Sequence, residues 1–414
     1  MSILGIATST VTALVRPVTA PEHDRDAVAE RFARATWTAI SEPGDRVASR
    51  VVQTVGAETA LGSLIDDHSG GMLQHTLTDA GVDIDPSELA DAVQRWVPRI
   101  SKPDALLAFR QAARFGLSLV VPGDPDWPTA IDDLGEHAPH ALWVRGNRGA
   151  LIALDASIAV VGARAATGYG EHVTVEAAAG LVDRGYAIVS GAAYGIDGAA
   201  HRAALASSGT TIAFLAGGLD RFYPSGHDAL LGRIIEQGAA ISEVPCGVAP
   251  TKWRFLQRNR LIAAAARATV VVEAGSRSGS LNTAGHAAAL GRPLGAVPGP
   301  VTSSASAGCH RLLREYDAAC VTTADEIAEL FPLDERRPPT AGDVVRPAAD
   351  PTGTRTRLLD ALAPRSARTP DKLAAISGLA VDRVRAELGL LALDGLARER
   401  GDGWIRSPER QQQS

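Results

Sequence analysis

A chain of 414 residues with 45% apolar content is long enough for two or three domains with real hydrophobic cores. Its formal net charge of −6 excludes a wholesale polycation, so a surface that binds nucleic acid must be a local basic patch. The three cysteines lack metal-ligand spacing and disulfide-framework density, and no apolar run approaches membrane-spanning length, so the sequence predicts a soluble cytoplasmic protein without a metal site.

The first part of the chain is predicted to be helical. Residues 1 to about 20 have the character of a loose lead-in. Apolar side chains then recur at helical spacing, and Asp85-Pro86 and Ser101-Lys102-Pro103 mark helix starts, since proline suits the first turn of a helix. The expected helices cover residues 25–40, 58–65, 86–97 and 103–115. We therefore predict an N-terminal helical domain over residues 1–116.

From residue 117 to 332, short apolar runs alternate with glycine turns and helical patterns. The expected strands are 117–121, 142–144, 157–161, 187–190, 211–215, 240–243, 269–273 and 293–297. This alternation indicates an α/β domain with an open, Rossmann-like parallel sheet. In such sheets ligands gather beyond the carboxyl ends of the strands, where backbone N–H groups and helix N-termini attract phosphate.

The last part of the chain is predicted to be a separate module. Residues 333–353 combine proline, glycine and charge without an apolar period, which is typical of a flexible linker. Residues 354–407 then show three helical patterns and a glycine-turned hairpin, with Gly378 near the turn between the second and third helices. Three helices and a hairpin indicate a C-terminal winged-helix domain.

Two glycine turns follow neighbouring central strands, at residues 162–170 and from Gly191 onward. The first turn is not the G-x-G-x-x-G dinucleotide fingerprint, and a tight turn that needs positive φ explains its glycines equally well. Arg164 and Thr167 favour a functional interpretation, because an arginine there can fork onto a phosphate held by the same turn.

The segment 252–260 crowds four cations into nine positions, with aromatic residues between them. Its cations and aromatics are Lys252, Trp253, Arg254, Phe255, Arg258 and Arg260. We expect a loop up to Trp253 and a helix over residues 259–266. Cations neutralise phosphates, and an aromatic face accepts a stacked base from an unpaired strand. The alternative is a solvated basic loop whose aromatics anchor the core.

The turn 276–280 offers successive N–H groups and hydroxyls before a helix. This arrangement suits a phosphate, although a plain helix N-cap explains it equally well.

Acidic and histidine side chains near the glycine turns raise the question of catalysis. Asp197 and His201 lie four residues apart on one helical face, where such residues more often cap and buttress a helix than exchange protons. Glu243 and Glu273 end predicted strands, and we expect them to bond to nearby backbone or to an arginine. We predict no catalytic residue and no cofactor.

In these glycine turns and in several motifs downstream, the sequence resembles the DNA-processing protein A (DprA, or Smf) family, over roughly residues 118 to 330. The motifs that carry the resemblance are Val161–Arg164, Thr167–Gly170, Ser190–Asp197, Ala200-His201, Gly218–Pro224, Ser242-Glu243, Phe255, Arg258–Arg260, Ser278–Leu281, Thr283-Ala284 and Val297–Gly299. Because many separate motifs fall in one order, the resemblance is strong.

The resemblance implies a pocket for single-stranded DNA, lined by the equivalents of Arg164, Lys252 and Phe255 and shaped in part by Asn259 and Arg260. It also implies an N-terminal domain related to SAM and helix-hairpin-helix modules, from which we expect no direct DNA contact, since no clean Gly-x-Gly hairpin is present. The residues to which we assign DNA binding are Arg164, Thr167, Gly191, Lys252, Phe255, Arg258, Asn259, Arg260, Ser278, Gly279 and Ser280.

We therefore expect a non-enzymatic recombination mediator. As the resemblance implies, it protects single-stranded DNA and loads a RecA-type recombinase in natural transformation, as a homodimer. The rival interpretation is a nucleotide-binding hydrolase of the lysine-decarboxylase-like phosphoribohydrolase group, which shares this type of sheet. That group carries Pro-Gly-Gly-x-Gly-Thr before a catalytic glutamate, whereas Pro298-Gly299 is followed here by Pro300.

Overall fold

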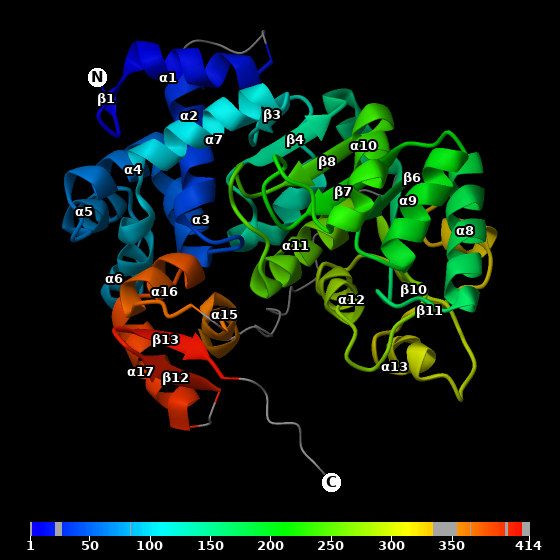
Figure 1. Cartoon of the computed structure of the whole chain (residues 1–414). Coiled ribbons are helices and arrows are strands. Elements are labelled where there is room, and N and C mark those ends of the chain that lie inside the picture. The colour runs from blue at the N-terminus through cyan, green and yellow to red at the C-terminus, as the bar shows by residue number, and fades with distance from the viewer. Residues whose placement is uncertain are drawn as a thin grey trace.

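The computed structural model describes residues 2–20, 27–82, 84–333, 354–364, 366–393 and 396–407. A nine-stranded sheet runs through the middle of the molecule (Figure 1). Its strands are β3 (Leu117–Val120), β4 (Leu142–Gly146), β5 (Ser157–Val161), β6 (Ala187–Ser190), β7 (Thr211–Leu215), β8 (Ala239–Ser242), β9 (Ala268–Val271), β10 (Leu294–Ala296) and β11 (Ala319–Cys320). Their order is β11-β10-β9-β5-β6-β7-β8-β4-β3, and every pairing is parallel except the two that β4 makes with β8 and β3. The predicted α/β class is confirmed.

The central strands are apolar without interruption because helices cover both faces of the sheet. Every residue of β5, β6, β7, β8 and β9 is buried. The order of the strands reverses at β5: the chain proceeds through β6, β7 and β8 on one side of it and places β9 on the other. A crevice opens at the carboxyl ends of strands at such a reversal. The turns after β5 and β9 lie at this point.

The covering helices divide between the two faces. One face carries α11 (Lys252–Ala265), α12 (Ser280–Ala289) and α13 (Ala307–Glu315), which bury their apolar sides against β5, β7 and β9. The other carries α8 (Gly168–Asp183), α9 (Ile196–Ala206), α10 (Asp228–Gln237) and α14 (Ala324–Ala328). Two layers of helices thus enclose the sheet, as Figure 1 shows.

The N-terminal part is helical, as expected, but its first residues are not a loose lead-in. The helices are α1 (Thr8–Val15), α2 (Ala27–Ile40), α3 (Arg46–Val55), α4 (Ala57–Asp66), α5 (Gly71–Asp79), α6 (Pro86–Trp96) and α7 (Lys102–Arg114). Asp85 and Ser101 cap α6 and α7, which confirms the predicted starts. The lead-in expectation was wrong, because Val11 and Val15 of α1 are buried; a short hairpin of β1 (Ser2–Ile3) and β2 (Ile6–Ala7) precedes them.

The N-terminal helices contribute to two apolar cores. Helices α3 to α6 bury their side chains mainly among themselves and with α2. Helices α1, α2 and α7 instead share a core with the sheet, in which Phe32 and Phe109 pack with Leu119, Trp143 and Leu231. The division at residue 116 remains a proposal, since the apolar packing crosses it.

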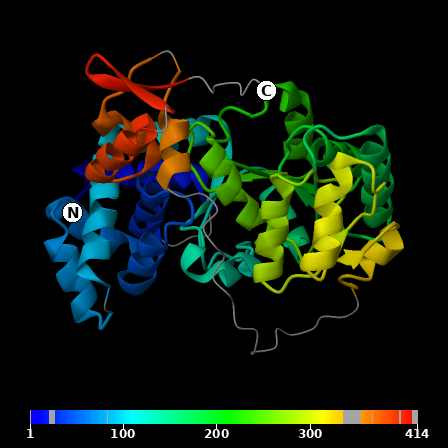
Figure 2. The ribbon, with the colours of Figure 1, turned by 90° about the horizontal axis from the view of Figure 1, so that it is seen from below.

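The C-terminal residues form the predicted winged-helix module. It consists of α15 (Thr354–Ala361), α16 (Pro370–Ser377), α17 (Val381–Leu393) and a hairpin of β12 (Ala397–Arg400) and β13 (Gly403–Arg406). Gly378 ends α16 with a φ of 66°, as its predicted place near the turn requires. Apart from Leu333, the predicted linker 333–353 lies outside the described residues. Figure 2 shows the module beside the N-terminal helices, at one end of the sheet. Across the described residues, no helix combines the length and apolarity needed to span a bilayer.

Candidate nucleic-acid interface

A cleft of about 1030 Å³ opens at the carboxyl edge of the parallel strands. Most of its lining comes from three segments: the turn after β5, the first half of α11 and the turn 275–280 after β9. These are the segments that the strand reversal at β5 brings to one edge. Of the predicted residues, eight line the cleft: Arg164, Lys252, Phe255, Arg258, Asn259, Ser278, Gly279 and Ser280.

The helix α11 determines which of the basic side chains reach the cleft. It begins at Lys252, where the Thr251 hydroxyl accepts a hydrogen bond from the N–H of Arg254 and caps it. The prediction that the helix starts at residue 259 was therefore wrong by about two turns. Because residues three and four apart share a helix face, Lys252, Phe255 and Asn259 point to the cleft together.

Phe255 lies at the centre of a cationic and aromatic group in the cleft. The Cζ atoms of Arg164 and Arg258 lie 5.1 and 5.8 Å from its ring centroid, within cation–π range. The ring of Tyr223 lies 5.4 Å away at an interplanar angle of 53°. Arg164, Lys252 and Tyr223 are exposed, and neither cation forms a salt bridge with a described residue. Positive charge and π surface are thus presented together to solvent.

Arg258 lies deeper, at the floor of the cleft. Its guanidinium donates to the carbonyl oxygen of Gly191 at 2.8 Å and to that of Phe214, and Nε donates to Asn259 Oδ1 at 3.2 Å. Burial lowers the pKa of Arg258 to about 10, while Asp197 acts to raise it. A Cβ atom at Gly191 would lie 2.5 Å from the guanidinium, so Gly191 makes room for Arg258. Arg258 thus ties α11 to the carboxyl ends of β6 and β7, and Gly191 leaves the space for it.

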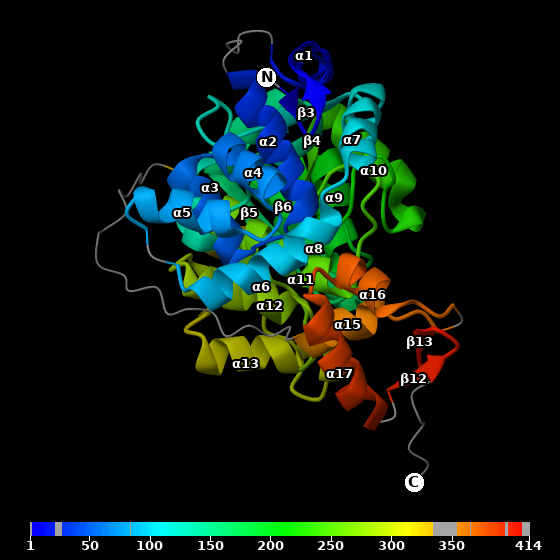
Figure 3. The ribbon, with the colours of Figure 1, turned by 90° about the vertical axis from the view of Figure 1, so that its left-hand side faces the viewer.

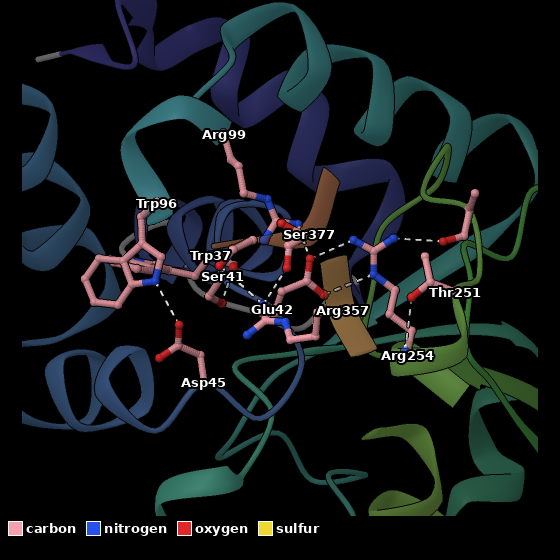
Figure 4. Close-up of polar contacts among 12 residues, drawn as sticks. Trp37, Ser41, Glu42, Asp45, Trp96, Arg99, Thr251, Arg254, Arg357 and Ser377 are labelled. Atoms are coloured by element: carbon pink, nitrogen blue, oxygen red, sulfur yellow. Dashed lines mark hydrogen bonds and ion pairs between the residues drawn. The ribbon is translucent and has the colours of Figure 1, made fainter. Parts of the chain in front are cut away.

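Two further arginines of α11 are held in ion pairs on the side away from the cleft. Arg260, with 2% of its side chain exposed, donates through Nη2 to both carboxylate oxygens of Glu243, at 2.7 and 2.8 Å. Arg254 donates to Glu42 of the N-terminal segment at 2.8 and 3.1 Å (Figure 4). Burial raises the pKa of the Glu42 carboxyl, but Arg254 and Arg99 outweigh it and lower that pKa to about 2.

The remaining predicted residues position the turns. Thr167 caps α8 and donates from its N–H and hydroxyl to Glu273, at 2.9 and 2.8 Å. Asn259 Nδ2 donates to the carbonyl oxygen of Gly279 at 3.3 Å, which ties α11 to the turn before α12. In that turn the hydroxyls of Ser278 and Ser280 lie 2.7 Å apart and face the cleft. Thr167, Gly191 and Arg260 are not among the lining residues.

The acidic and histidine side chains have the structural roles expected of them. Asp197 accepts from the N–H of Gly191 at 3.1 Å, and His201 Nδ1 lies 2.6 Å from the hydroxyl of Thr211. Burial lowers the pKa of His201 to about 3. Glu273 and Glu243, engaged by Thr167 and Arg260, bond as predicted to backbone and to an arginine.

Sequence reasoning missed three residues that matter at this site, and one of them, Arg277, is an exposed cation that lines the cleft. Tyr223, 52% exposed, faces Phe255, and its place in a family motif was the available signal. Glu42 had no signal, because it lies 212 positions away from the Arg254 that it binds.

Comparison with known proteins gives consistent results. The family described as DNA recombination-mediator protein A matches residues 118–332, and the DprA winged helix domain matches residues 340–403. A DNA processing protein DprA of Mycobacterium tuberculosis is 50% identical over 307 residues, which cover 70% of this chain and 77% of the relative. The DNA processing protein DprA of Streptococcus pneumoniae is 40% identical over 206 residues, 50% of this chain and 72% of the relative.

A solved structure shows the same likeness in the fold. The X-ray structure of DNA processing protein A from Streptococcus pneumoniae superposes with a TM-score of 0.57 at 29% sequence identity. The match covers 73% of this chain and 97% of that one.

Proposed function

Because the chain belongs to the DNA recombination-mediator protein A family, we propose that it binds single-stranded DNA in the cleft at the carboxyl edge of its sheet. Bound DNA is protected there and handed to a RecA-type recombinase, as in natural transformation. The protein acts as a homodimer and without a catalytic step of its own.

The observation that carries the proposal is the grouping of Arg164, Lys252, Phe255 and Tyr223 in one cleft. Unpaired nucleic acid offers phosphates on one side and base faces on the other, and such a strand is bound by combining cations with aromatic platforms. A duplex hides its base faces, so the aromatic pair favours the single strand. Arg164, Lys252 and Arg277 are the exposed cations among the described residues that line it.

The predicted residues divide into two groups under this proposal. Arg164, Lys252, Phe255 and the turn 278–280 contact DNA directly. The others act through position: Arg258 with Gly191 supports the floor, Asn259 holds the serine turn, and Thr167 and Arg260 fix the helices that frame the cleft.

Lys252→Ala in the full chain tests the proposal. Affinity for fluorescently labelled oligo-dT, measured by anisotropy at several salt concentrations, should fall, and the salt slope should flatten by roughly one phosphate's worth because one counterion fewer is released. Lys372→Ala is the matched control, since Lys372 is an exposed lysine of α16. If the variant binds like the parent while thermal melts show it folded, the cleft is not the DNA site.

A further inference from the structure

The winged-helix module docks on the first turn of α11, at the rim of the cleft. The Cζ atom of Arg357 in α15 lies 4.8 Å from the ring centroid of Trp253. Arg357 also donates to the carbonyl oxygens of Ser377 and Gly378, at 2.7 and 3.3 Å. Figure 3 shows α15 and α16 beside α11, and in Figure 1 they lie between α11 and α6.

The docked position is well packed. The space left between α15, α16 and the start of α11 is about 10 Å³, which is barely enough for one water molecule. Glu42 lies at its wall, with Arg254 on one side and Arg99 on the other (Figure 4). A Cβ atom at Gly378 would lie 2.6 Å from Glu42 Cγ, so glycine lets α16 approach this group. The three parts of the chain meet here.

Asp360 of α15 occupies the N-terminus of α11. Its Oδ2 atom accepts a hydrogen bond from the N–H of Trp253 at 3.2 Å, and its charge interacts favourably with Lys252. The first N–H groups of a helix and a neighbouring lysine are the groups that a phosphate would engage. The Asp360 carboxylate therefore occupies the position that a DNA phosphate would take at the rim of the cleft.

The contact between the winged-helix module and α11 adjoins the cleft, because one residue lines both. Thr251, the N-cap of α11, lines both the small space beside Asp360 and the cleft that holds Lys252 and Phe255. Burial raises the pKa of Asp360, although the Trp253 amide and Lys252 act to lower it.

Resting on the function proposed above, we propose that the winged-helix module restrains the DNA cleft by an internal contact. When docked, Asp360 accepts a hydrogen bond from the first turn of α11 and its charge attracts Lys252 without a direct ion pair. A DNA phosphate that takes Lys252 competes with Asp360 and releases the module. By linkage, DNA weakens docking as docking weakens DNA binding, so a change that loosens docking strengthens DNA binding, by at most the same factor.

Charge alone gives the opposite prediction for one variant, which makes the proposal testable. Arg357→Ala removes a positive charge and the contact with Trp253. Under simple electrostatics it weakens binding of a polyanion. Under competition it undocks the module, and full-chain affinity for oligo-dT rises by about fivefold or more, within the usual range of coupling between sites. Asp360→Asn raises the affinity as well.

Two controls on the same module match these charge changes. Arg385→Ala removes an exposed arginine of α17, and Asp371→Asn neutralises an exposed aspartate of α16. Arg385→Ala should not raise the affinity for oligo-dT as Arg357→Ala does, and Asp371→Asn should not raise it as Asp360→Asn does. Hydrogen exchange on the unmodified chain is the second measurement: saturating oligo-dT should speed exchange of the α15 amides.

The outcomes separate the two proposals. Arg357→Ala binding no tighter than the parent, or added protection of α15 by DNA, overturns the competition. If Lys252→Ala still weakens binding in that case, the DNA site in the cleft stands alone. If the unmodified chain does not bind oligo-dT, both proposals fail.

Discussion

The two sides of α11 use the same residue types for opposite purposes. On the side facing the cleft, Lys252 is exposed beside Phe255. On the other side, Arg254 and Arg260 are buried in ion pairs with Glu42 and Glu243. The position of each basic residue on α11, and whether a carboxylate lies beside it, determines whether it can bind a ligand or only stabilises the fold. The difference teaches that a cluster of cations in a sequence overstates the charge available to a ligand.

Glu42→Gln tests the buried side and should have the largest effect. Removing one partner of a buried ion pair leaves uncompensated charge and costs about 3–5 kcal/mol. Here Arg254 and Arg99 would both lose their carboxylate, so the free energy of unfolding in urea should fall by that order.

The pH dependence gives an independent check on Glu42. Its pKa is lowered from 4.5 to about 2 by the arginines, against the effect of burial. A carboxyl whose pKa is lower in the folded state stabilises the fold above its unfolded pKa, and this stability is lost as pH falls from about 4.5 through about 2. The variant should lack this part of the acid dependence.

Glu88→Gln is the control for Glu42, because Glu88 pairs with the half-exposed Arg46 at the surface. It should cost no more than about 1 kcal/mol. Equal costs at Glu42 and Glu88 would show that the buried side contributes no more than an ordinary surface pair.

Phe255→Ala tests the side that faces the cleft, with a smaller effect. The loss of one stacked base costs about 1–3 kcal/mol in binding, and the salt slope should stay unchanged because no cation is removed. Oligo-dT titrations at several salt concentrations distinguish this result from that of Lys252→Ala. A variant that melts like the parent and keeps full affinity would leave Phe255 as a packing residue.

Ser278→Ala should have the smallest effect. The Ser278 hydroxyl lies 2.7 Å from that of Ser280 at the edge of the cleft. If it bonds a phosphate, its removal weakens oligo-dT binding by about 0.5–1.5 kcal/mol, the usual net contribution of one hydrogen bond. If the affinity of this variant for oligo-dT is unchanged, the Ser278 hydroxyl does not bind DNA and the turn serves only to begin α12.

The sheet could be predicted from the sequence because buried parallel strands are continuous apolar runs between glycine turns. The strands from Ser157–Val161 to Ala268–Val271 follow this pattern. Helix α3 was missed because its sequence, RVASRVVQTV, is rich in β-branched valine, and tertiary packing overrides that weak helix propensity. The short edge strand β11, two residues long, offers too little pattern to be predicted.

For the site, the sequence identified which segments converge, and it could not sort the side chains within them. The start of α11 at Lys252 depends on the Thr251 cap, and a threonine before a basic run reads equally well as part of a loop. Whether Arg254 is free or paired depends on Glu42, which only the folded chain brings near. Such distant pairings leave no local trace in a single sequence.

The core that α1, α2 and α7 share with the sheet has a consequence for how the chain folds as it is synthesised. Phe32 and Phe109 emerge from the ribosome well before Ala213 and Leu231, against which the same core closes. Translation at roughly 5–20 residues per second leaves these helices without their partners for several seconds. During that interval their apolar faces are open to chaperones or to other nascent chains, so the yield of folded protein should depend on the rate of elongation between α7 and α10.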